Sequence, residues 1–311
     1  MPRSDRAAYL MLVGMAISFG GTWVAADVAV EAAPPFTIAA LRFGIASVLL
    51  YAWSRLAGRR LTPIRRADLP LIAGLALTAV AGYNWLFLTG LTLAPASDGA
   101  IIVPGLAPVF TALLAGATLG ERLGPRVFAG LAIAAAGLYL VVMPGGGTSE
   151  TRLLGDALFL AGAALWGVYS VLARIASRRF DAVSTTLYGI ALGTVILVPA
   201  ALLEGGAERV LDAPIGALAG IGYLAVFGTV AAFVLLNLGV ARLGAARASA
   251  FALLVPVIGV LSSVWLLGDP IGPNTVIGGA IVLVGLWLVE HPGSAPTRPA
   301  AVQAGVPAEG R

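Results

Sequence analysis

Arg42 is the residue most able to bind a charged ligand, because it falls inside the long apolar stretch Pro35–Leu56. A guanidinium in hydrocarbon is costly unless it faces a helix-bundle interior, water or a partner. One interpretation is an anion anchor, since a guanidinium binds a carboxylate through two parallel hydrogen bonds. The other is a structural arginine that reaches the membrane interface or pairs with Asp27 or a helix C-terminus.

Carboxylates that could exchange protons lie near the ends of apolar stretches rather than in their middle. Asp27 and Asp98 occupy such ends, as does Asp156. Asp27 and Asp98 are therefore candidate coupling groups at the mouth of a cavity. The alternative for Asp98 is an N-cap, which would satisfy free amides at the start of a helix. For Glu121 and Asp269, at the ends of later stretches, we expect contacts to neighbouring helix ends.

Aromatic and amide side chains inside the apolar stretches form a further set. Aromatic groups away from the membrane interface either line an apolar cavity or pack against one another. An amide inside a membrane needs a partner or a wet cavity. The predicted cavity residues are Trp23, Arg42, Tyr83, Asn84, Phe87, Trp166, Tyr169, Phe233 and Asn237.

Prolines interrupt two of the apolar stretches, at Pro104, Pro108 and Pro256. Proline removes a backbone hydrogen bond and kinks a helix. We interpret these positions as kinks that could bend during a conformational change, with a fixed kink required for packing as the alternative.

Several kinds of chemistry lack the residues they need. The chain has no cysteine and no lysine, and its one histidine is His291 in a polar segment. A metal centre, a thiol site or a Ser–His or Ser–Lys catalytic pair is therefore not expected. We predict no cofactor and no enzymatic activity.

The elements that must position these residues are membrane-spanning helices. Apolar residues make up 59% of the chain and charged residues 11%, whereas a soluble domain carries about 25% charged residues. A helix needs about 20 apolar residues to cross the hydrocarbon core. The sequence predicts an all-α membrane protein with ten such helices: Ala8–Ala26, Pro35–Leu56, Leu69–Leu91, Asp98–Leu119, Pro125–Met143, Leu153–Ile175, Val183–Leu203, Ile215–Leu238, Ala245–Leu267 and Pro273–Val289.

The arginines orient these helices. All of the 19 basic residues except Arg42, Arg152 and Arg209 fall on one side when the helices alternate in direction. The positive-inside rule puts that side, and both termini, in the cytoplasm. Because the arginines border hydrophobic helices, we expect a lipid bilayer as their partner and no nucleic acid.

Two distant parts of the chain repeat one another. When residues 96–142 are aligned with 244–290, about a third of the pairs are identical, among them Pro108 with Pro256. The fourth and fifth helices thus recur as the ninth and tenth. A five-helix unit has an odd number of crossings, so the second copy is inverted. The predicted units are residues 1–146 and 147–290, arranged around a central cavity and followed by a disordered cytoplasmic tail, 291–311.

Short motifs follow one another in a characteristic order in both halves. In the first half they are Gly20-Gly21-Thr22-Trp23, Leu41-Arg42-Phe43, Leu93-Ala94-Pro95-Ala96-Ser97, Pro108-Val109-Phe110 and Leu119-Gly120-Glu121-Arg122-Leu123. In the second half they are Trp166, Ala248-Ser249, Pro256-Val257, Leu267-Gly268-Asp269 and Gly278. This order resembles the EamA type of the drug/metabolite transporter superfamily. Asp269 departs from the glutamate that is more usual there.

The resemblance implies export of small metabolites or amphiphilic compounds through a central cavity. Arg42 favours an amino acid or related carboxylate, moved by alternating access across the inner membrane. A sugar-phosphate or nucleotide-sugar carrier is the main alternative, followed by a channel or facilitator without ion coupling. The lack of an acid in the middle of a helix argues against proton antiport. We expect a monomer or a weak homodimer.

Overall fold

The computed structural model describes residues 3–31, 33–119, 124–142, 149–243 and 251–290. Over these ranges the chain forms helices joined by short connections. Seven of the described helical segments are long and apolar enough to cross a membrane, and three shorter ones, Pro125–Val141, Leu254–Leu267 and Pro273–Val289, are also apolar. These ten segments confirm the predicted all-α membrane fold. The predicted tail, 291–311, lies outside the described residues.

Several crossings are interrupted helices. The first consists of α1 (Arg3–Gly20) and α2 (Thr22–Val30). The third and eighth each contain a π-helical segment, in which backbone hydrogen bonds span five residues instead of four. The segments of the third are α4 (Leu69–Leu75), η2 (Ala76–Gly82) and α5 (Tyr83–Leu91). Those of the eighth are α11 (Ile215–Ala225), η3 (Val226–Ala231) and α12 (Ala232–Leu243).

The remaining crossings are α3 (Pro35–Leu56), α6 (Ala96–Leu119), α7 (Pro125–Val142), α8 (Glu150–Ala176), α9 (Ala182–Glu204), α14 (Leu254–Ser262) with its π-helical extension η4 (Ser263–Leu267), and α15 (Pro273–Glu290). Two short helices, η1 (Arg66–Asp68) and α10 (Ala207–Leu211), lie in connections. Pro104 and Pro108 lie inside α6, whereas Pro256 lies in the first turn of α14, where a missing N–H costs little.

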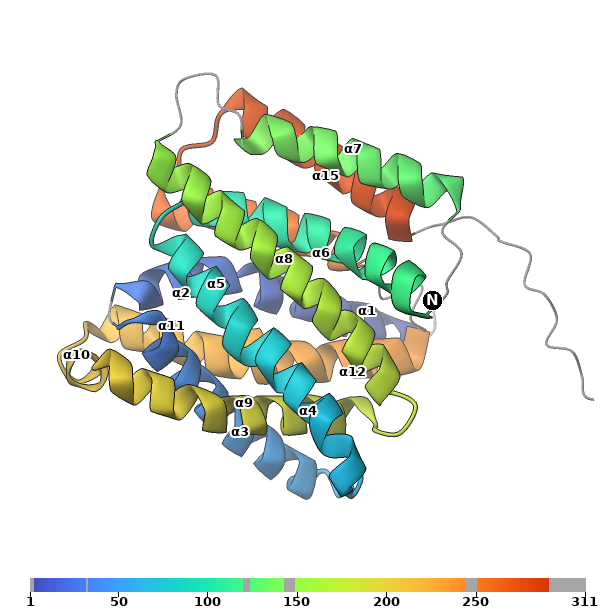
Figure 1. Cartoon of the computed structure of the whole chain (residues 1–311), viewed down its shortest axis with the longest axis vertical. Helices are drawn as coiled ribbons and strands as arrows, with labels where there is room; N and C mark the ends of the chain where they lie inside the picture. Colours follow the sequence, from blue (N-terminus) through green and yellow to red (C-terminus); the bar gives the residue numbers. More distant parts are fainter. Residues whose placement is uncertain (1–2, 32, 120–123, 143–148, 244–250, 291–311) are drawn as a thin grey trace, which may run out of the picture.

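Helix packing reflects the repeat. α3 packs along α9, α6 along α14, and α7 along α15, so each of these helices contacts its counterpart in the other half. α5 packs on α8 as α12 packs on α1. In Figure 1, α7 and α15 form a separate layer at the top. Glycines make that layer tight, because a Cβ added to Gly137 would lie 2.7 Å from the carbonyl oxygen of Gly278. The duplicated halves therefore surround a shared interior.

Candidate functional site

A cavity of about 540 Å³ lies at the centre of the bundle, between the two halves. Its walls come from the first four crossings of the first half and from α8, α12, η3, α14 and α15 of the second. The residues expected from the sequence that line it are Trp23, Arg42, Tyr83, Asn84, Phe87, Pro104, Pro108, Trp166, Tyr169 and Phe233. The structure thus brings ten of the singled-out positions together around one volume large enough for a small ligand.

Four other singled-out residues are not among the described lining of this cavity. The side chain of Asn237 lies outside the described residues. Pro256 borders a second, smaller apolar pocket with Ile101 and Val282. Asp27 is half-buried on α2, and Asp98 is buried at the start of α6. The two carboxylates therefore lie at the end of the bundle beyond the cavity rather than in its wall.

Arg42 is held in the cavity wall by three neutral acceptors. Its side chain is 7% exposed. Nε donates to Thr229 Oγ1 at 3.1 Å, Nη1 donates to Asn84 Oδ1 at 3.1 Å, and Nη2 donates to the carbonyl oxygen of Gly228 at 3.3 Å. The guanidinium has five N–H groups, and within the described part of the chain no carboxylate forms an ion pair with it. Its positive charge is therefore oriented but not neutralised.

The π-helical segments η2 and η3 help to build this arrangement. Asn84 Nδ2 donates to the carbonyl of Ala79, and Thr229 Oγ1 donates to the carbonyl of Leu224, each five residues earlier in the chain. These bonds fix the rotamers that present Asn84 Oδ1 and Thr229 Oγ1 to Arg42. A π-helical turn shifts the register of the residues after it, so the third and eighth crossings each aim one polar side chain at the same guanidinium.

Aromatic rings form a continuous wall beside Arg42. The Trp166 ring lies 4.9 Å from that of Tyr83 and 5.0 Å from that of Tyr169, measured between centroids. Tyr83 stacks with Phe87 at 5.8 Å, and Phe87 meets Trp23 edge-on at 4.9 Å. The cavity therefore combines one unneutralised cation with a large apolar and aromatic surface, which matches an amphiphilic ligand with an anionic group.

Over the described residues, the lining of the cavity reaches an exposed side chain toward one end of the bundle. Its lining extends along α8 to Arg174, which is exposed, and along α15 to Val289. Toward the opposite end it stops at Trp23, which is buried between Phe87 and Phe159. A Cβ at Gly259 would lie 2.9 Å from the Trp23 ring, so α14 also closes on this residue. Trp23 thus forms the floor of a cavity that opens beside Arg174.

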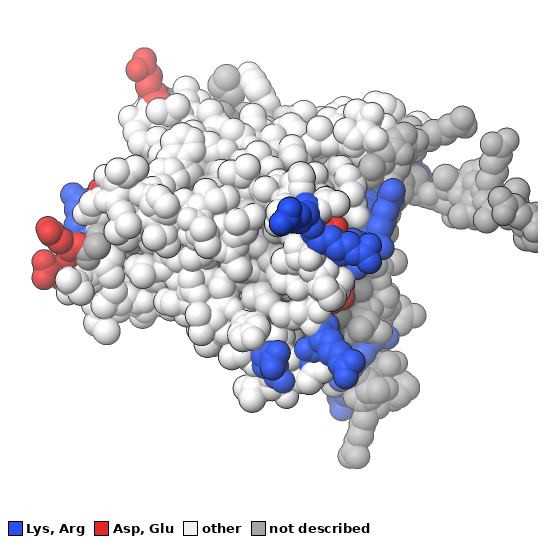
Figure 2. Space-filling model, turned by 60° about the horizontal axis from the view of Figure 1, so that its bottom comes forward, with Lys and Arg blue, Asp and Glu red and all other residues white. Residues whose placement is uncertain are grey.

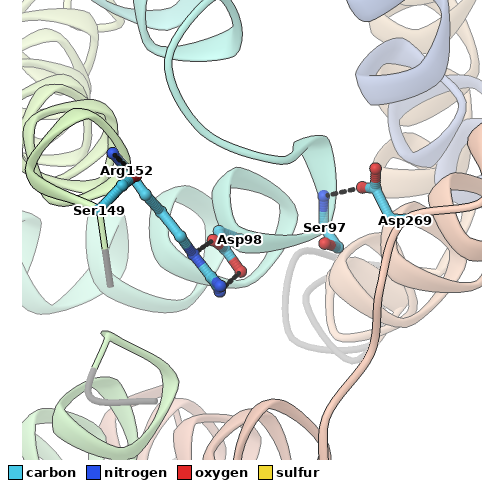
Figure 3. A network of polar contacts seen from close by, with 5 residues as sticks. All are labelled: Ser97, Asp98, Ser149, Arg152 and Asp269. Carbon is cyan, nitrogen blue, oxygen red and sulfur yellow. Dashed lines mark hydrogen bonds and ion pairs between the residues drawn. The ribbon is translucent and has the colours of Figure 1, made fainter. Parts of the chain in front are cut away.

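Beyond Trp23, polar contacts join the helix ends (Figure 3). Arg152 of α8 binds both carboxylate oxygens of Asp98, with Nε–Oδ2 at 2.8 Å and Nη2–Oδ1 at 3.0 Å. Asp269 accepts a hydrogen bond from the backbone N–H of Ser97 at 2.9 Å. The expected contact of Asp269 with a neighbouring helix end is thereby confirmed. The N-cap interpretation of Asp98 is wrong, because α6 already begins at Ala96 and the Asp98 carboxylate is engaged by Arg152.

Sequence reasoning missed Thr229, Gly228 and Arg152 as members of these clusters. Thr229 and Gly228 gave no signal, because one threonine and one glycine are ordinary in an apolar helix. The position of Arg152 in the sequence did carry a signal. Arg152 is one of two arginines that the sequence places on the outer side of the membrane, and it follows a predicted outer connection. Among the described residues, no group of three or more His, Cys, Asp or Glu side chains is arranged to hold a metal ion.

Comparison with known proteins assigns the fold to a family. The model of the EamA-like transporter family matches twice, over residues 6–143 and 153–290. The chain belongs to the EamA-like transporter family. It is therefore a multi-pass membrane transporter of the drug/metabolite transporter superfamily and not an enzyme.

Individual relatives cover most of the chain. An uncharacterized transporter, YyaM, of Bacillus subtilis is 32% identical over 89% of this chain and 92% of its own length. A probable terminal-alkyne amino-acid exporter of Streptantibioticus cattleyicolor is 32% identical over 73% of this chain and 75% of its own length. An uncharacterized inner membrane transporter, YedA, of Escherichia coli K12 is 28% identical over 89% of both chains. A crystal structure with 22% identity superposes with a TM-score of 0.61, covering 91% of this chain and 96% of its own, and supports the fold.

Proposed function

We propose that this protein exports a small carboxylate-bearing metabolite, an amino acid or a related amphiphile, across the inner membrane by alternating access. The observation that carries this proposal is the unneutralised Arg42 in the wall of an aromatic cavity between the two halves. A guanidinium buried with only neutral acceptors gains strongly from an anionic ligand, because a charge in a medium of low dielectric constant is otherwise poorly solvated.

The number of basic residues that line the cavity favours a ligand with one carboxylate over a ligand with a phosphate group. A sugar phosphate or nucleotide sugar carries two or more negative charges, which proteins match with several basic groups. Among the described lining residues the basic ones are Arg42 in the wall and Arg174 at the open end. The relative from Streptantibioticus cattleyicolor, a probable terminal-alkyne amino-acid exporter, supports the same ligand class and the outward direction.

The orientation follows from the distribution of arginines. Figure 2 shows most of the blue Arg side chains in view at one end of the molecule, whereas the opposite end shows mainly red acidic side chains with some blue beside them. By the positive-inside rule the arginine-rich end faces the cytoplasm. Arg174, beside which the cavity opens, belongs to the arginines predicted to be cytoplasmic. We therefore propose that the cavity faces the cytoplasm in this state and that both termini lie on the cytoplasmic side.

A single chain supplies the complete site. Residues 1–146 and 147–290 each form one five-helix unit in this proposal, and the cavity lies between them. A second copy is not required for binding, so we propose that a monomer is sufficient for transport. Closure at Trp23 argues against a continuously open channel, because the Trp23 ring packs against Phe87 and Phe159 at the end of the cavity lining.

Transport by purified protein in liposomes tests this function. A mixture of amino acids, organic acids and their neutral amides would be offered, with and without a pH gradient, and accumulation read by mass spectrometry. We expect Arg42→Ala to lower transport of carboxylates roughly 10- to 100-fold, since hydrogen bonds to charged groups contribute about 1.5–3 kcal/mol, and to spare the amides. Arg209→Ala, which changes an exposed arginine outside the cavity, should have no effect.

Two outcomes would contradict the proposal in different ways. Equal loss of carboxylates and amides in correctly folded Arg42→Ala would exclude the anion anchor. Accumulation of phosphorylated compounds in place of carboxylates would favour the sugar-phosphate alternative. Transport that does not depend on a pH gradient would identify a facilitator without coupling to protons.

A further inference from the structure

A buried carboxyl group without a hydrogen-bond donor among the described residues lies at the closed end of the bundle. Asp156 of α8 is 3% exposed, and no N–H or hydroxyl group of the described residues donates to either of its carboxylate oxygens. The polar side chain within hydrogen-bonding reach is the carboxylate of Asp98. It follows Arg152 by four residues, so the two side chains share one face of the helix. Buried polar groups are normally hydrogen-bonded, and an orphaned one calls for a functional explanation.

The charges around Asp156 are unfavourable for its ionised form. Asp98 of α6 is the acidic group that acts on it, and Arg152 on its own helix is the basic one. Arg152, however, already binds both oxygens of Asp98. Asp269 adds a further negative charge beside Asp98, whereas η2 and α5, which also pack on α8, contain no Asp, Glu, Lys or Arg.

Protonation of Asp156 removes two unfavourable contributions to the free energy of the closed state. The ionised group would be a buried anion without hydrogen bonds, next to a second anion. The neutral carboxyl group avoids this repulsion and can donate a hydrogen bond to Asp98. In the closed arrangement Asp156 is therefore a proton-binding group, and its proton can exchange with water only when α6 and α8 separate.

We propose that Asp156 binds a proton while the outer end is closed and releases it when that end opens, which makes Asp98, Arg152 and Asp156 a proton-sensitive outer gate. This inference rests on the alternating access of the proposed function. On opening, Arg152 loses Asp98 and pairs with ionised Asp156, four residues away on the same helix, while the proton passes to outside water. Acid outside the membrane then favours the closed gate, and alkali favours the open one.

The charged residues of the outer gate have no counterparts at the equivalent positions of the first repeat. Trp23 and Trp166 occupy equivalent positions in the two repeats, so the residue ten positions before Trp23 corresponds to Asp156, and that residue is Val13. The equivalent of Arg152 is Tyr9. The inner end of the bundle therefore lacks this pair, and the inverted symmetry is broken where the outer gate carries its charges.

The absence of cysteine in the natural chain allows a direct test with single thiols. Ser97→Cys introduces a nearly isosteric thiol at a position that is 1% exposed and whose hydroxyl has no hydrogen-bond partner. Thr92→Cys supplies an exposed thiol at the same end. A membrane-impermeant maleimide would be added on the outer side of oriented vesicles. Dividing the two labelling rates at each pH removes the pH dependence of the thiol itself.

We expect the relative labelling of Ser97→Cys to rise roughly tenfold from about pH 5 to about pH 9, the range covered by buried carboxyl groups. With Asp156→Asn, a permanently neutral side chain, labelling should stay low at every pH. Asp156→Ser is a second variant with the same expectation should the amide disturb packing. Glu150→Gln, which changes an exposed acid on the same helix, should retain the full pH dependence.

The possible failures separate the gate from the transporter. A pH dependence that survives in Asp156→Asn and Asp156→Ser would overturn the proton site. If Ser97→Cys with an unchanged Asp156 is labelled at a rate that does not depend on pH, the proton site is also overturned. Alternating access would remain supported in that case. If Ser97→Cys is never labelled from outside, even with the carboxylate mixture present, alternating access fails and the gate fails with it.

Discussion

At the scale of single residues, Arg42 depends on the groups that hold it. Thr229 Oγ1 accepts from Nε, and Asn84 Oδ1 accepts from Nη1, so two crossings of different halves fix the plane of the guanidinium. A planar group with fixed orientation loses less conformational entropy when it binds a carboxylate than a freely rotating one does. Thr229 is therefore a positioning residue for the proposed ligand rather than a contact of the ligand itself.

The Thr229→Val variant tests this role. Valine has a similar shape but removes the hydroxyl, which leaves Nε without its acceptor and costs about 1–2 kcal/mol. We expect the KM for a transported carboxylate to rise roughly tenfold, with a smaller change in the maximal rate. Thr229→Ser keeps the hydroxyl and should restore the KM. A similar rise in both variants would show that packing of the methyl group, not the hydrogen bond, is what Thr229 provides.

At the scale of elements, a connection at the arginine-rich end is tied down by one helix start. Asp181 is the N-cap of α9 and accepts hydrogen bonds from the backbone N–H groups of Val183 and Ser184. It also accepts bonds from the hydroxyls of Ser184 and Thr62. Thr62 belongs to the connection between α3 and α4, so this cap joins the second and third crossings to the seventh.

The cap predicts a pH dependence of stability. Partial burial raises the pKa of Asp181, but the hydrogen bonds from Ser184, Val183 and Thr62 outweigh it and hold the pKa below its ordinary value. A group with a lowered folded pKa stabilises the fold above its unfolded pKa and loses this effect as pH falls through the folded value. We expect Asp181→Ala to lower the free energy of unfolding in detergent by about 1 kcal/mol at neutral pH. The difference should shrink as the pH falls through the lowered folded pKa of Asp181.

A matched control separates the cap from general charge effects. Glu208→Ala removes an exposed acidic side chain from the short helix α10. Its effect on the unfolding free energy should be small at neutral pH and in acid. A deficit of Asp181→Ala that persists unchanged in acid would mean that the hydrogen bonds of the ionised carboxylate are not its cause.

At the scale of the whole molecule, the repeat determines where the cavity lies. Equivalent helices of the two halves make equivalent contacts, and α6 with α14 and α7 with α15 are helices that pack against their own counterparts. The interior shared by the halves contains Arg42 and the aromatic wall. In the proposed function, closure at Trp23 and opening beside Arg174 correspond to one of the two states of an alternating-access cycle.

The sequence predicted these large features because they depend on composition and period. Ten apolar stretches and the repeated Pro and Gly positions were sufficient for the membrane fold and for the family, and both are confirmed. The depth of Trp23, Tyr83 and Trp166 within their helices left cavity lining and packing as alternatives, and in the structure these rings both line the cavity and contact other aromatic rings. Asp269 was expected to bind a neighbouring helix end and binds the amide of Ser97.

The direction in which each side chain points from its helix could not be predicted from the sequence. The π-helical segments η2 and η3 rotate the residues after them about the helix axis, and apolar composition alone does not reveal such segments. Asp98 and Arg152 are 54 residues apart in the chain, so their ion pair could not be distinguished from an N-cap at Asp98. Such contacts depend on how helices from different halves meet, which a single sequence without side-chain geometry does not specify.

In the proposed function, the cavity between the halves binds the transported compound and opens to the cytoplasm. Ser170 lines this cavity on α8, and Ser170→Cys would provide its single thiol. We predict that an impermeant maleimide labels this thiol in inside-out vesicles and that a transported carboxylate slows the labelling, whereas its neutral amide does not. Labelling only from the outer side, or no protection by any compound that the protein transports, would contradict this function of the cavity.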